Sequence, residues 1–488
     1  MKTHRFGLAL AIALAGMTAY AQQERFRRTP PPPEPLQALK LPRIERAVLS
    51  NQLDVSIVTR ENGPFAGLQL VVYAGESRSP NGMAGTATLA AGFLGQATLV
   101  RSVAGIEEFL DSIGGSLSVS VNQDYVVLTI HFLEDYLDAA LEFLSQILLQ
   151  PDFSRTEVDF LKFTATYDLL AREKDPDFAA RRHLARMLFQ GHPYEKLAFS
   201  SDAVRGWNPA GVADFFDRYY RPNNARVILA SRVGLNVATR KISQYLNQWQ
   251  PRELPASSLQ PLKPPAKERI CLVNIPQARE CMVYLGTVFP ALGNAERFDM
   301  AVQNQVFGGT PTSRLFMNLR ETKAFANFAY SETGIFKAGG TFLVRAKVRP
   351  EVVTPALAEI RKEVRALVRE PMTPLEIEQA KSYLIFNFPL QLERYDAFSR
   401  RLAENQARGD GEEFWSRYYE QVVLVNAERV FATAQKVLSQ PFVYVIAGDH
   451  ALLSEHLAEL ESYDVFDAKG RFEYSVTKDK KGVVHEAR

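Results

Sequence analysis

The chain has 488 residues, of which 46% are hydrophobic, and this is enough for two to four domains of about 100 to 200 residues each. Its 57 Lys and Arg nearly cancel its 55 Asp and Glu, so no overall field favours nucleic acid or an anionic membrane. Its only two cysteines, Cys271 and Cys281, exclude a disulfide-rich scaffold and a multi-cysteine metal site. A small ligand or a protein is therefore the expected partner.

The N-terminus has the pattern of a secretory signal peptide. Lys2 and Arg5 precede the apolar run 6–17, and the small-x-small triplet 19–21 follows it. The run is shorter than the roughly 20 apolar residues that span a membrane. We therefore expect cleavage before Gln22 and an exported, periplasmic or extracellular chain without a transmembrane anchor.

Two proline-rich stretches divide the chain. Residues 29–35 and 251–265 cannot form a regular helix or a central strand. The first indicates a flexible leader, and the second indicates a linker between two halves of similar length. The predicted organisation is a signal peptide (1–21), a leader (22–44), a first module (45–250), a linker (251–267), a second module (268–470) and a tail (471–488).

Each half repeats one order of predicted elements. The first half has strands at 53–58 and 68–73, a helix at 84–98, a strand at 125–132, a helix at 137–149 and a closing strand at 226–230. The second half has strands at 270–275 and 282–288, a helix at 295–306, a strand at 340–348, a helix at 353–368 and a closing strand at 442–447. These repeats predict two copies of one α+β module rather than four unrelated domains.

The two cysteines lie on apolar runs, 269–275 and 281–289, that we expect to form a β-hairpin. The short turn between these runs does not place the two sulfur atoms opposite each other. A disulfide in an oxidising compartment and two buried free thiols both remain open for Cys271 and Cys281.

A series of short motifs runs along residues 45 to 450. They are Asn51-Gln52-Leu53, Gly75-Glu76-Ser77-Arg78, Pro151-Asp152-Phe153, Tyr219-Tyr220-Arg221-Pro222-Asn223-Asn224, Gly308-Gly309-Thr310-Pro311-Thr312-Ser313-Arg314-Leu315-Phe316, Leu319-Arg320-Glu321, Thr373-Pro374-Leu375-Glu376 with Ala380-Lys381, and Ala447-Gly448-Asp449. In order and spacing, this series resembles the insulinase (pitrilysin-type) family of zinc metallopeptidases, in its branch of bacterial processing peptidases. The resemblance implies two homologous α+β halves, each an antiparallel sheet with helices on one face, that close around a substrate chamber.

The zinc-binding motif of that family is degenerate in this sequence. Active members carry H-x-x-E-H on the first helix, where two His one turn apart bind zinc and the Glu polarises a water. Here the His positions fall on Thr88 and Gly92 and the Glu position on Ala91, none of which is a good zinc ligand. The third family ligand, a Glu further along the chain, falls at or next to Asp168. The resemblance therefore implies a non-catalytic homologue with no cofactor of its own, and zinc is expected only in a partner subunit.

The sequence shows no replacement for this metal site. The seven His, at 4, 131, 183, 192, 450, 456 and 485, include no pair three or four residues apart. His450 and His456 would lie about 240° apart around a helix, so surface positions are expected for both. His183 and His192 flank a helix end and are also expected at the surface. Neither a G-x-S-x-G nucleophile motif nor a phosphate-binding loop occurs.

The second half keeps part of a substrate-binding pair. In paired members of the family, the non-catalytic subunit contributes an Arg and a Tyr that contact the substrate carbonyl at the partner's site. The Arg position matches Arg320, whose guanidinium can donate to a peptide carbonyl or a carboxylate. Asn327 stands at the Tyr position, and Tyr330 follows three residues on. Arg320 could instead bridge only to Glu321, and Arg314 is expected to anchor its own turn.

The sequence leaves two functions open. One is a non-catalytic subunit of a heteromeric peptidase, in which a homologue with H-x-x-E-H supplies zinc and this chain supplies half of the chamber. The other is a stand-alone protein that binds a peptide or unfolded polypeptide, or assists assembly, without catalysis. Co-purification with a zinc-containing homologue would separate the two. Neither function involves nucleic acid.

Overall fold

The structure is a computed structural model of the chain. It describes residues 42–59, 63–256, 259–392, 397–411, 413–479 and 482–486, which belong to one compact unit that begins at Leu41. The predicted signal peptide and residues 22–41 of the predicted leader lie outside the described residues, so both stay predictions. Within the described part of the chain, no helix has both the length and the apolar character needed to cross a bilayer.

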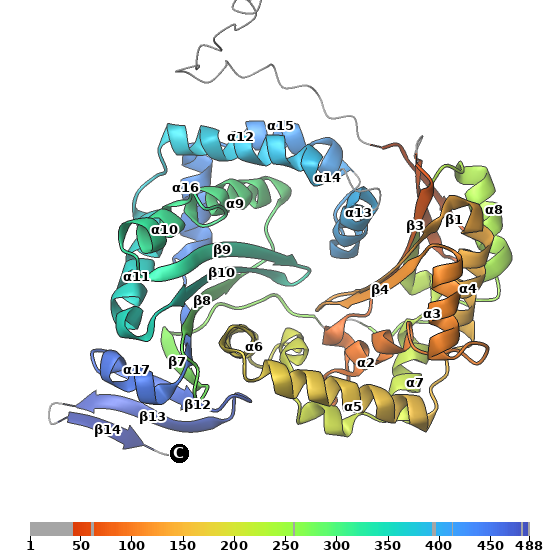
Figure 1. Cartoon of the computed structure of the whole chain (residues 1–488). Helices are drawn as coiled ribbons and strands as arrows, with labels where there is room; N and C mark the ends of the chain where they lie inside the picture. Colours follow the sequence, from red (N-terminus) through yellow and green to blue (C-terminus); the bar gives the residue numbers. More distant parts are fainter. Residues whose placement is uncertain are drawn as a thin grey trace, which may run out of the picture. The chain divides into compact units, whose positions relative to one another are not determined.

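The first half is built on a sheet that has six strands among the described residues (Figure 1). The strands are β1 (Ile44–Val48), β2 (Asp54–Thr59), β3 (Phe65–Val72), β4 (Ser116–Val121), β5 (Val126–Leu133) and β6 (Ala225–Ser231). Their order is β1-β2-β6-β3-β5-β4, and all neighbours are antiparallel except β2 and β6. The edge strand β4 alternates exposed serines with half-buried apolar residues, whereas β3 in the centre is almost entirely buried.

Helices cover one face of this first sheet. They are α2 (Thr86–Phe93), α3 (Val103–Ser112), α4 (Leu137–Leu149), α7 (Pro209–Tyr219) and α8 (Leu235–Leu246). The sequence of α4 shows why it packs there, because Leu137, Leu141, Leu144 and Leu148 recur every three or four residues and all four are buried. Two further helices, α5 (Arg155–Arg172) and α6 (Pro176–Leu188), follow α4.

The second half repeats this plan on a larger sheet of eight described strands. The strands are β7 (Arg269–Asn274), β8 (Cys281–Phe289), β9 (Ala326–Phe336), β10 (Gly339–Val348), β11 (Val443–Gly448), β12 (Ser462–Phe466), β13 (Phe472–Asp479) and β14 (Gly482–Glu486). Their order is β14-β13-β12-β7-β11-β8-β10-β9, with β7 parallel to β11 and to β12. Helices α9 (Asn294–Phe307), α11 (Val353–Arg369), α16 (Ala427–Leu438) and α17 (His450–Leu457) pack on one face.

The remaining helices of the second half are α10 (Arg314–Phe316), α12 (Pro374–Leu390), α13 (Ala397–Arg408), α14 (Glu413–Ser416) and α15 (Tyr418–Val423). Of these, α12 and α13 follow the β10–α11 unit in the same order in which α5 and α6 follow β5 and α4 in the first half. The two halves therefore have the same plan, in which each half contains one sheet and a pair of helices that lead away from it.

The predicted α+β class and the two repeated modules are confirmed, and three details differ from the prediction. Each sheet is mixed rather than antiparallel. The strands β7 and β8 do not form the predicted hairpin, because β11 lies between them. Residues 471–488, predicted as a tail, contain β13 and β14. Cys271 and Cys281 thus lie on separate strands as buried free thiols, and burial raises the pKa of each to about 12.

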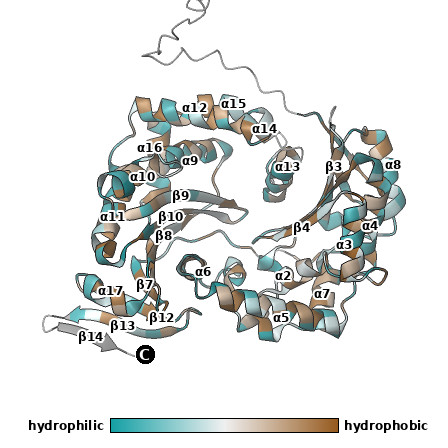
Figure 2. Ribbon diagram, in the orientation of Figure 1, coloured by the Kyte–Doolittle hydropathy of each residue, from teal (hydrophilic) through white to brown (hydrophobic). Residues whose placement is uncertain are grey.

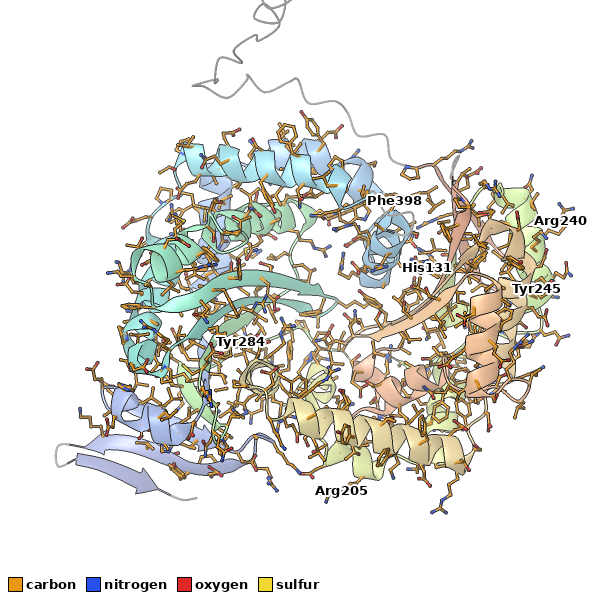
Figure 3. The ribbon with its side chains drawn as sticks, in the orientation of Figure 1. His131, Arg205, Arg240, Tyr245, Tyr284 and Phe398 are labelled. Atoms are coloured by element: carbon orange, nitrogen blue, oxygen red, sulfur yellow. The ribbon has the colours of Figure 1, made fainter. Side chains whose placement is uncertain are left out.

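Each half also lends one helix to the sheet of the other half, whereas the prediction placed helices on one face of each sheet only. Ala180, Leu184 and Leu188 of α6 pack against β7, β8 and β11 of the second sheet. Phe398 and Leu402 of α13 pack against β3 and β6 of the first sheet, and Figure 3 labels Phe398. In Figure 2 both sheets carry hydrophobic colouring along their strands. Separation of the halves would expose these apolar faces to water.

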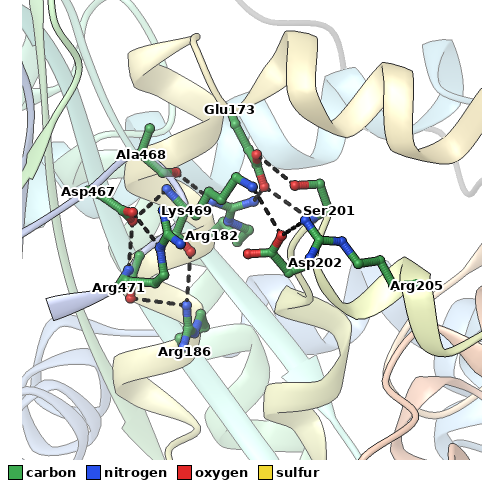
Figure 4. Close-up of polar contacts among 11 residues, drawn as sticks. Glu173, Arg182, Arg186, Ser201, Asp202, Arg205, Asp467, Ala468, Lys469 and Arg471 are labelled. Carbon is green, nitrogen blue, oxygen red and sulfur yellow. Dashed lines mark hydrogen bonds and ion pairs between the residues drawn. The ribbon is translucent and has the colours of Figure 1, made fainter.

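A buried ion pair fixes the position of α6 (Figure 4). Arg182 donates to Glu173 over 2.6 Å, and the two side chains are only 5% and 4% exposed. Glu173 also accepts hydrogen bonds from the N–H and the hydroxyl of Ser201. Arg182 donates to the carbonyl of Ala468 in the β12–β13 turn, and Arg186 donates to two further carbonyls of that turn. The pair therefore ties α6 of the first half to the sheet of the second half.

The proline-rich segment 251–267 contains neither helix nor strand in its described residues. It is nevertheless packed, because Leu262 is buried and its N–H donates to the carbonyl of Ala338 over 2.8 Å. Ala338 lies in the β9–β10 turn, so the segment runs along the second sheet. The module boundary placed at this segment stays a prediction.

Glu173→Ala should lower the free energy of unfolding by about 3 to 5 kcal/mol, because it leaves the Arg182 guanidinium buried without its carboxylate. Asp214→Ala is the matched control. The Asp214–Arg218 pair of α7 is 2.8 Å long with both side chains more than half exposed, and such pairs contribute about 1 kcal/mol or less. Equilibrium denaturation in guanidinium chloride compares the two variants. Equal losses would show that the buried pair does not anchor α6.

Candidate functional site

The degenerate motif positions lie on the short helix α2. Thr88 and Gly92 are four residues apart and therefore share one face of the helix, with Ala91 beside them. All three residues line the same cavity. This arrangement is the one that the two zinc-binding His and the catalytic Glu would need, but the side chains are a hydroxyl, a methyl group and a hydrogen atom.

A buried carboxylate holds the start of α2. Glu76 accepts hydrogen bonds from the N–H groups of Gly85 and Thr88, from the Thr88 hydroxyl over 3.0 Å and from the Ser79 hydroxyl over 2.7 Å. A carboxylate at this position complements the partial positive charge of a helix N-terminus. Gly85 has a φ of 88°, and a Cβ on it would lie 2.5 Å from the ring of Trp207, so this position requires glycine. The hydroxyl of Thr88 is thus committed to Glu76.

The residues present at α2 do not fit a zinc ion. Asp168, at the third ligand position, lies on α5 and pairs with Arg172 over 3.0 Å, with both side chains more than half exposed. Zinc sites use Cys, His and carboxylate ligands, and Thr88, Ala91 and Gly92 offer none of these. In the described part of the chain, no group of three or more His, Cys, Asp and Glu side chains is close enough to hold a metal ion.

A cavity of about 930 Å³ occupies the space beside α2. The first half contributes α2, β4, α5 and α6 to its wall, through residues that include Thr88, Gly92, Val119 and Asp168. The second half contributes Glu332, Thr333, Gly334, Phe336, Thr341 and Leu343 from β9 and β10. Cavities of about 300 to 1,000 Å³ are the size that binds small ligands and side chains. The degenerate site is therefore one wall of a space that both halves enclose.

Polar contacts join the two halves at this cavity. Arg181 of α6 pairs with Glu332 of β9 over 2.8 Å. Tyr194 donates its hydroxyl to Asp124 over 2.7 Å and accepts the N–H of Ala338 over 3.0 Å, so both residues hold the β9–β10 turn. Asp124 also accepts the N–H of the preceding residue of that turn. The cavity wall from the second half is thereby fixed relative to the first half.

The strand β4 forms an edge of the first sheet at the cavity. Val119 and Val121 of β4 line the cavity, and among the described residues β4 pairs only with β5. An edge strand presents unpaired N–H and C=O groups to which a further extended chain can bind. The site therefore offers backbone hydrogen bonds next to apolar space, which suits an extended peptide.

Arg320 lies in the second half, and it is not among the residues that line the cavity. It belongs to a π-helical segment, Met317–Thr322, of a kind that often occurs at functional sites. Its guanidinium lies 5.0 Å from the ring centroid of Phe316 and pairs with Glu321 over 3.5 Å, and the side chain is half exposed. The ion pair with Glu321, which is the alternative role considered for Arg320, is thus present in the structure. The predicted substrate contact of Arg320 stays a prediction.

The other two predicted substrate contacts lie on β9, outside the cavity lining. Asn327 donates to Glu280 over 3.2 Å. Tyr330 packs against Phe316, with ring centroids 5.3 Å apart. The Arg320 guanidinium also lies over the ring of Phe316, so Arg320 and Tyr330 both contact that ring. The predicted role of Asn327 and Tyr330 in binding substrate stays a prediction.

Arg314 anchors its turn through an ion pair with Glu376 of α12. It donates to both oxygens of Glu376 over 2.6 and 2.7 Å, and these bonds lower the pKa of Glu376 to about 2. Glu376 also accepts the N–H of Thr373, which completes the cap of α12. Two of the motifs on which the family resemblance depends therefore meet in space.

The expectation that His183 lies at the surface is wrong. Its ring packs against Phe466 with centroids 4.2 Å apart, and neither ring nitrogen has a hydrogen-bond partner in the described part of the chain. Burial, together with the charges of Arg186 and Arg182, lowers the pKa of His183 to about 3. His183 lies on the face of α6 that packs against the other half, and a helical pattern alone does not reveal such a contact.

Sequence reasoning missed the far wall of the cavity and the cap of α2. The wall comes from α6, β9 and β10, and the residues singled out from the sequence on 326–336, Asn327 and Tyr330, are not among those that line the cavity. The alternation of residue types along 326–336 could have indicated an edge strand. Glu76 was part of a family motif, and its place shortly before a helix of small residues was the available signal for a capping role.

Comparisons with known proteins give relatives along most of the chain. Residues 55–200 match the family model for Insulinase (Peptidase family M16), and residues 207–384 match the model for Peptidase M16 inactive domain. An uncharacterized zinc protease of Mycobacterium tuberculosis is 24% identical over 376 residues, or 75% of this chain and 84% of that protein. The non-peptidase homolog YmxG of Helicobacter pylori is 25% identical over 361 residues, or 72% of this chain and 81% of that protein.

The fold also matches a solved structure. The crystal structure of a peptidase M16 inactive domain from Pseudomonas fluorescens superimposes with a TM-score of 0.77 at 18% sequence identity. The match covers 83% of this chain and 98% of that chain. At this identity the likeness shows the fold, and the two mixed sheets with their helices are accordingly shared.

Glu76 should make the stability of the chain depend on pH. Burial raises the pKa of Glu76 to about 7, although hydrogen bonds from Ser79, Gly85 and Thr88 act to lower it. The folded state thus holds this proton more tightly than the unfolded state, where the ordinary pKa is 4.5. The contribution of Glu76 to the free energy of unfolding is therefore complete below about pH 4.5 and is lost as the pH rises through about 7.

In Glu76→Gln, the loss of stability between about pH 4.5 and pH 7 should therefore be smaller than in the wild type. Glu142→Gln, at an exposed position of α4, is the control and should leave the pH profile unchanged. Thermal unfolding across this pH range measures all three proteins. Identical profiles for the wild type and Glu76→Gln would contradict the raised pKa.

Proposed function

This chain belongs to peptidase family M16, the insulinase family, and we propose that it is a non-catalytic subunit of a heteromeric zinc peptidase. In this role it binds part of a polypeptide substrate in the cavity beside α2, and a homologous subunit with the zinc-binding motif cleaves that substrate. One observation carries the proposal. The metal-binding side chains are missing from α2, while the cavity beside α2 is open and is built from both halves.

The cavity supports peptide binding on two physical grounds. A Leu or Phe side chain that moves from water into an apolar cavity is stabilised by about 1.5 to 3 kcal/mol. The adjacent edge of β4 offers main-chain hydrogen bonds that do not depend on the sequence of the bound segment. Because the apolar cavity and the strand edge lie together, we expect the chain to bind extended polypeptides that contain at least one large apolar residue.

Two observations favour a partner subunit over a stand-alone protein. First, the chain keeps the family fold over most of its length, although it lacks the family's metal ligands. Second, Arg320 remains half exposed on its π-helical segment. Among the described residues it lies over the ring of Phe316 and pairs with Glu321 over 3.5 Å, so N–H groups remain available to another molecule. A stand-alone peptide-binding protein would use the same cavity and would not need Arg320.

We also propose that the chain is exported. The basic residues Lys2 and Arg5, the apolar run 6–17 and the small residues of 19–21 support this proposal. Cys271 and Cys281 are buried free thiols on separate strands, so the fold does not depend on a disulfide in either compartment. Sequencing the N-terminus of the chain from its native host should give Gln22 as the first residue, and an intact Met1 would contradict export.

Ala165→Trp should weaken peptide binding by about tenfold or more, because Ala165 of α5 lines the cavity and an indole would fill part of it. Ala171→Trp is the matched control, since it adds the same indole to an exposed position of the same helix. Fluorescence anisotropy with a labelled peptide that contains one Leu measures the Kd of each variant. If Ala165→Trp binds the peptide as tightly as the wild type, the cavity is not the binding site.

Arg320→Ala should leave folding and assembly with the partner intact but lower the turnover of the complex by about ten to a thousandfold, the scale of losing one hydrogen-bond donor to a developing oxyanion. Arg320→Lys should recover little of this, because an ammonium lacks the planar fork of donors. Steady-state kinetics of the complex with the active homologue measure both variants. An unchanged rate in a complex that contains Arg320→Ala would assign Arg320 a structural role beside Phe316.

A further inference from the structure

We propose that Arg345 on β10 binds a carboxylate of the bound polypeptide. The preferred ligand would then carry an Asp or Glu side chain two residues from the apolar side chain that enters the cavity. This inference rests on the proposed function, because it takes a peptide in the cavity as its starting point. It specifies which class of peptide sequence the chain prefers to bind.

Arg345 lies on the same face of the second sheet as the cavity wall. Leu343 of β10 and Glu332 of β9 are opposite each other, and both line the cavity. Arg345 and Tyr330 form the next pair on the same face, two residues along each strand. Side chains two residues apart on a strand are about 6 to 7 Å apart and point to the same side. The guanidinium is therefore one such step from the cavity.

The charges around Arg345 leave it without a carboxylate. Its neighbours along this face are Arg181, which pairs with Glu332 over 2.8 Å, and Lys347, which pairs with Glu280. No ion pair to Arg345 is present within the described ranges, so no carboxylate is paired directly with its guanidinium there. A guanidinium without an ion-pair partner at the margin of an apolar cavity favours a carboxylate on the ligand.

The neighbouring carboxylate on α6 is also engaged elsewhere. Tyr284 of β8 lies opposite Arg345 on the other side of β10, and it is labelled in Figure 3. Its hydroxyl donates to Asp177 over 2.8 Å. Asp177 contacts Tyr284 in this way, and no ion pair joins it to Arg345 among the described residues.

Aromatic rings hold this guanidinium in place. It lies 5.5 Å from the ring centroid of Phe328, and Phe328 stacks on Tyr330 with centroids 6.0 Å apart. Tyr330 in turn contacts Phe316, which carries the guanidinium of Arg320. A guanidinium that lies over a ring keeps its N–H groups directed outward in the plane of the fork. That geometry matches the two oxygens of a carboxylate.

The surroundings favour a carboxylate over a phosphate group. A phosphate monoester carries a charge of about −1.5 to −2 at neutral pH, and binding sites for it usually combine several cations. Here Arg345 is one cation, and the carboxylates Glu332, Glu280 and Asp177 lie near it. In an extended peptide, residues two apart face the same side and adjacent residues face opposite sides. An acidic residue directly next to the apolar residue would therefore point away from Arg345.

Labelled synthetic peptides test this inference. Each contains one Leu and one Asp in a Gly and Ser background, separated by one residue, in both orders. For one of these orders, we expect a Kd about tenfold lower than that of the matched peptide with Asn in place of Asp. A peptide with Asp directly next to Leu should bind no more tightly than the Asn peptide.

Variants of the full chain assign this preference to a residue. Arg345→Gln should remove the preference for Asp without changing the Kd of the Asn peptide, and Arg345→Lys should keep part of it. Arg240→Gln, at an exposed position of α8 that Figure 3 labels, is the control and should keep the preference in full.

Two results would overturn the inference and leave the proposed function in place. One is equal binding of the Asp and Asn peptides by the wild type, in both orders. The other is a preference for Asp that survives in Arg345→Gln. If the wild type binds none of the peptides, the proposed function and this inference both fail.

Discussion

The buried ion pair between Arg182 and Glu173 is the contact on which the candidate site depends. Each side chain is almost fully removed from water, so neither charge can tolerate the loss of the other. The pair fixes α6, and α6 covers the second sheet and also forms part of the cavity wall. The reciprocal packing of α13 on the first sheet completes the exchange. The two halves therefore define the cavity together.

The site on α2 has kept its structure while losing its metal ligands. Glu76, Gly85 and Trp207 position this helix through a buried carboxylate, a left-handed backbone and a close ring contact, and none of these needs a metal ion. The side chains of Thr88, Ala91 and Gly92 are small, so they leave space beside the helix and provide no metal ligands. In the proposed account, this geometry binds a polypeptide segment and another subunit cleaves it.

Much of the fold could be predicted from the sequence, because it depends on local periodicity. The predicted helix 137–149 and α4 have the same limits, and the closing strands at 226–230 and 442–447 lie within one or two residues of β6 and β11. Some errors are local, because the strands β9, β13 and β14 were not predicted, and the others concern contacts between distant segments. The insertion of β11 between β7 and β8 follows from the closing of the sheet, and a pattern along 269–289 does not show it. The position of Arg345 beside the cavity likewise depends on the register of β9 and β10.

Metal analysis of the purified chain, combined with a peptidase assay, tests the central claim most directly. After dialysis against zinc, the wild type should contain far less than one zinc per chain and should hydrolyse no peptide alone. The variant Thr88→His, Ala91→Glu, Gly92→His is the positive control for binding, since a Cβ at Gly92 meets only Leu161, at 3.7 Å. About one zinc per wild-type chain, removed by a chelator together with peptidase activity, would contradict the account.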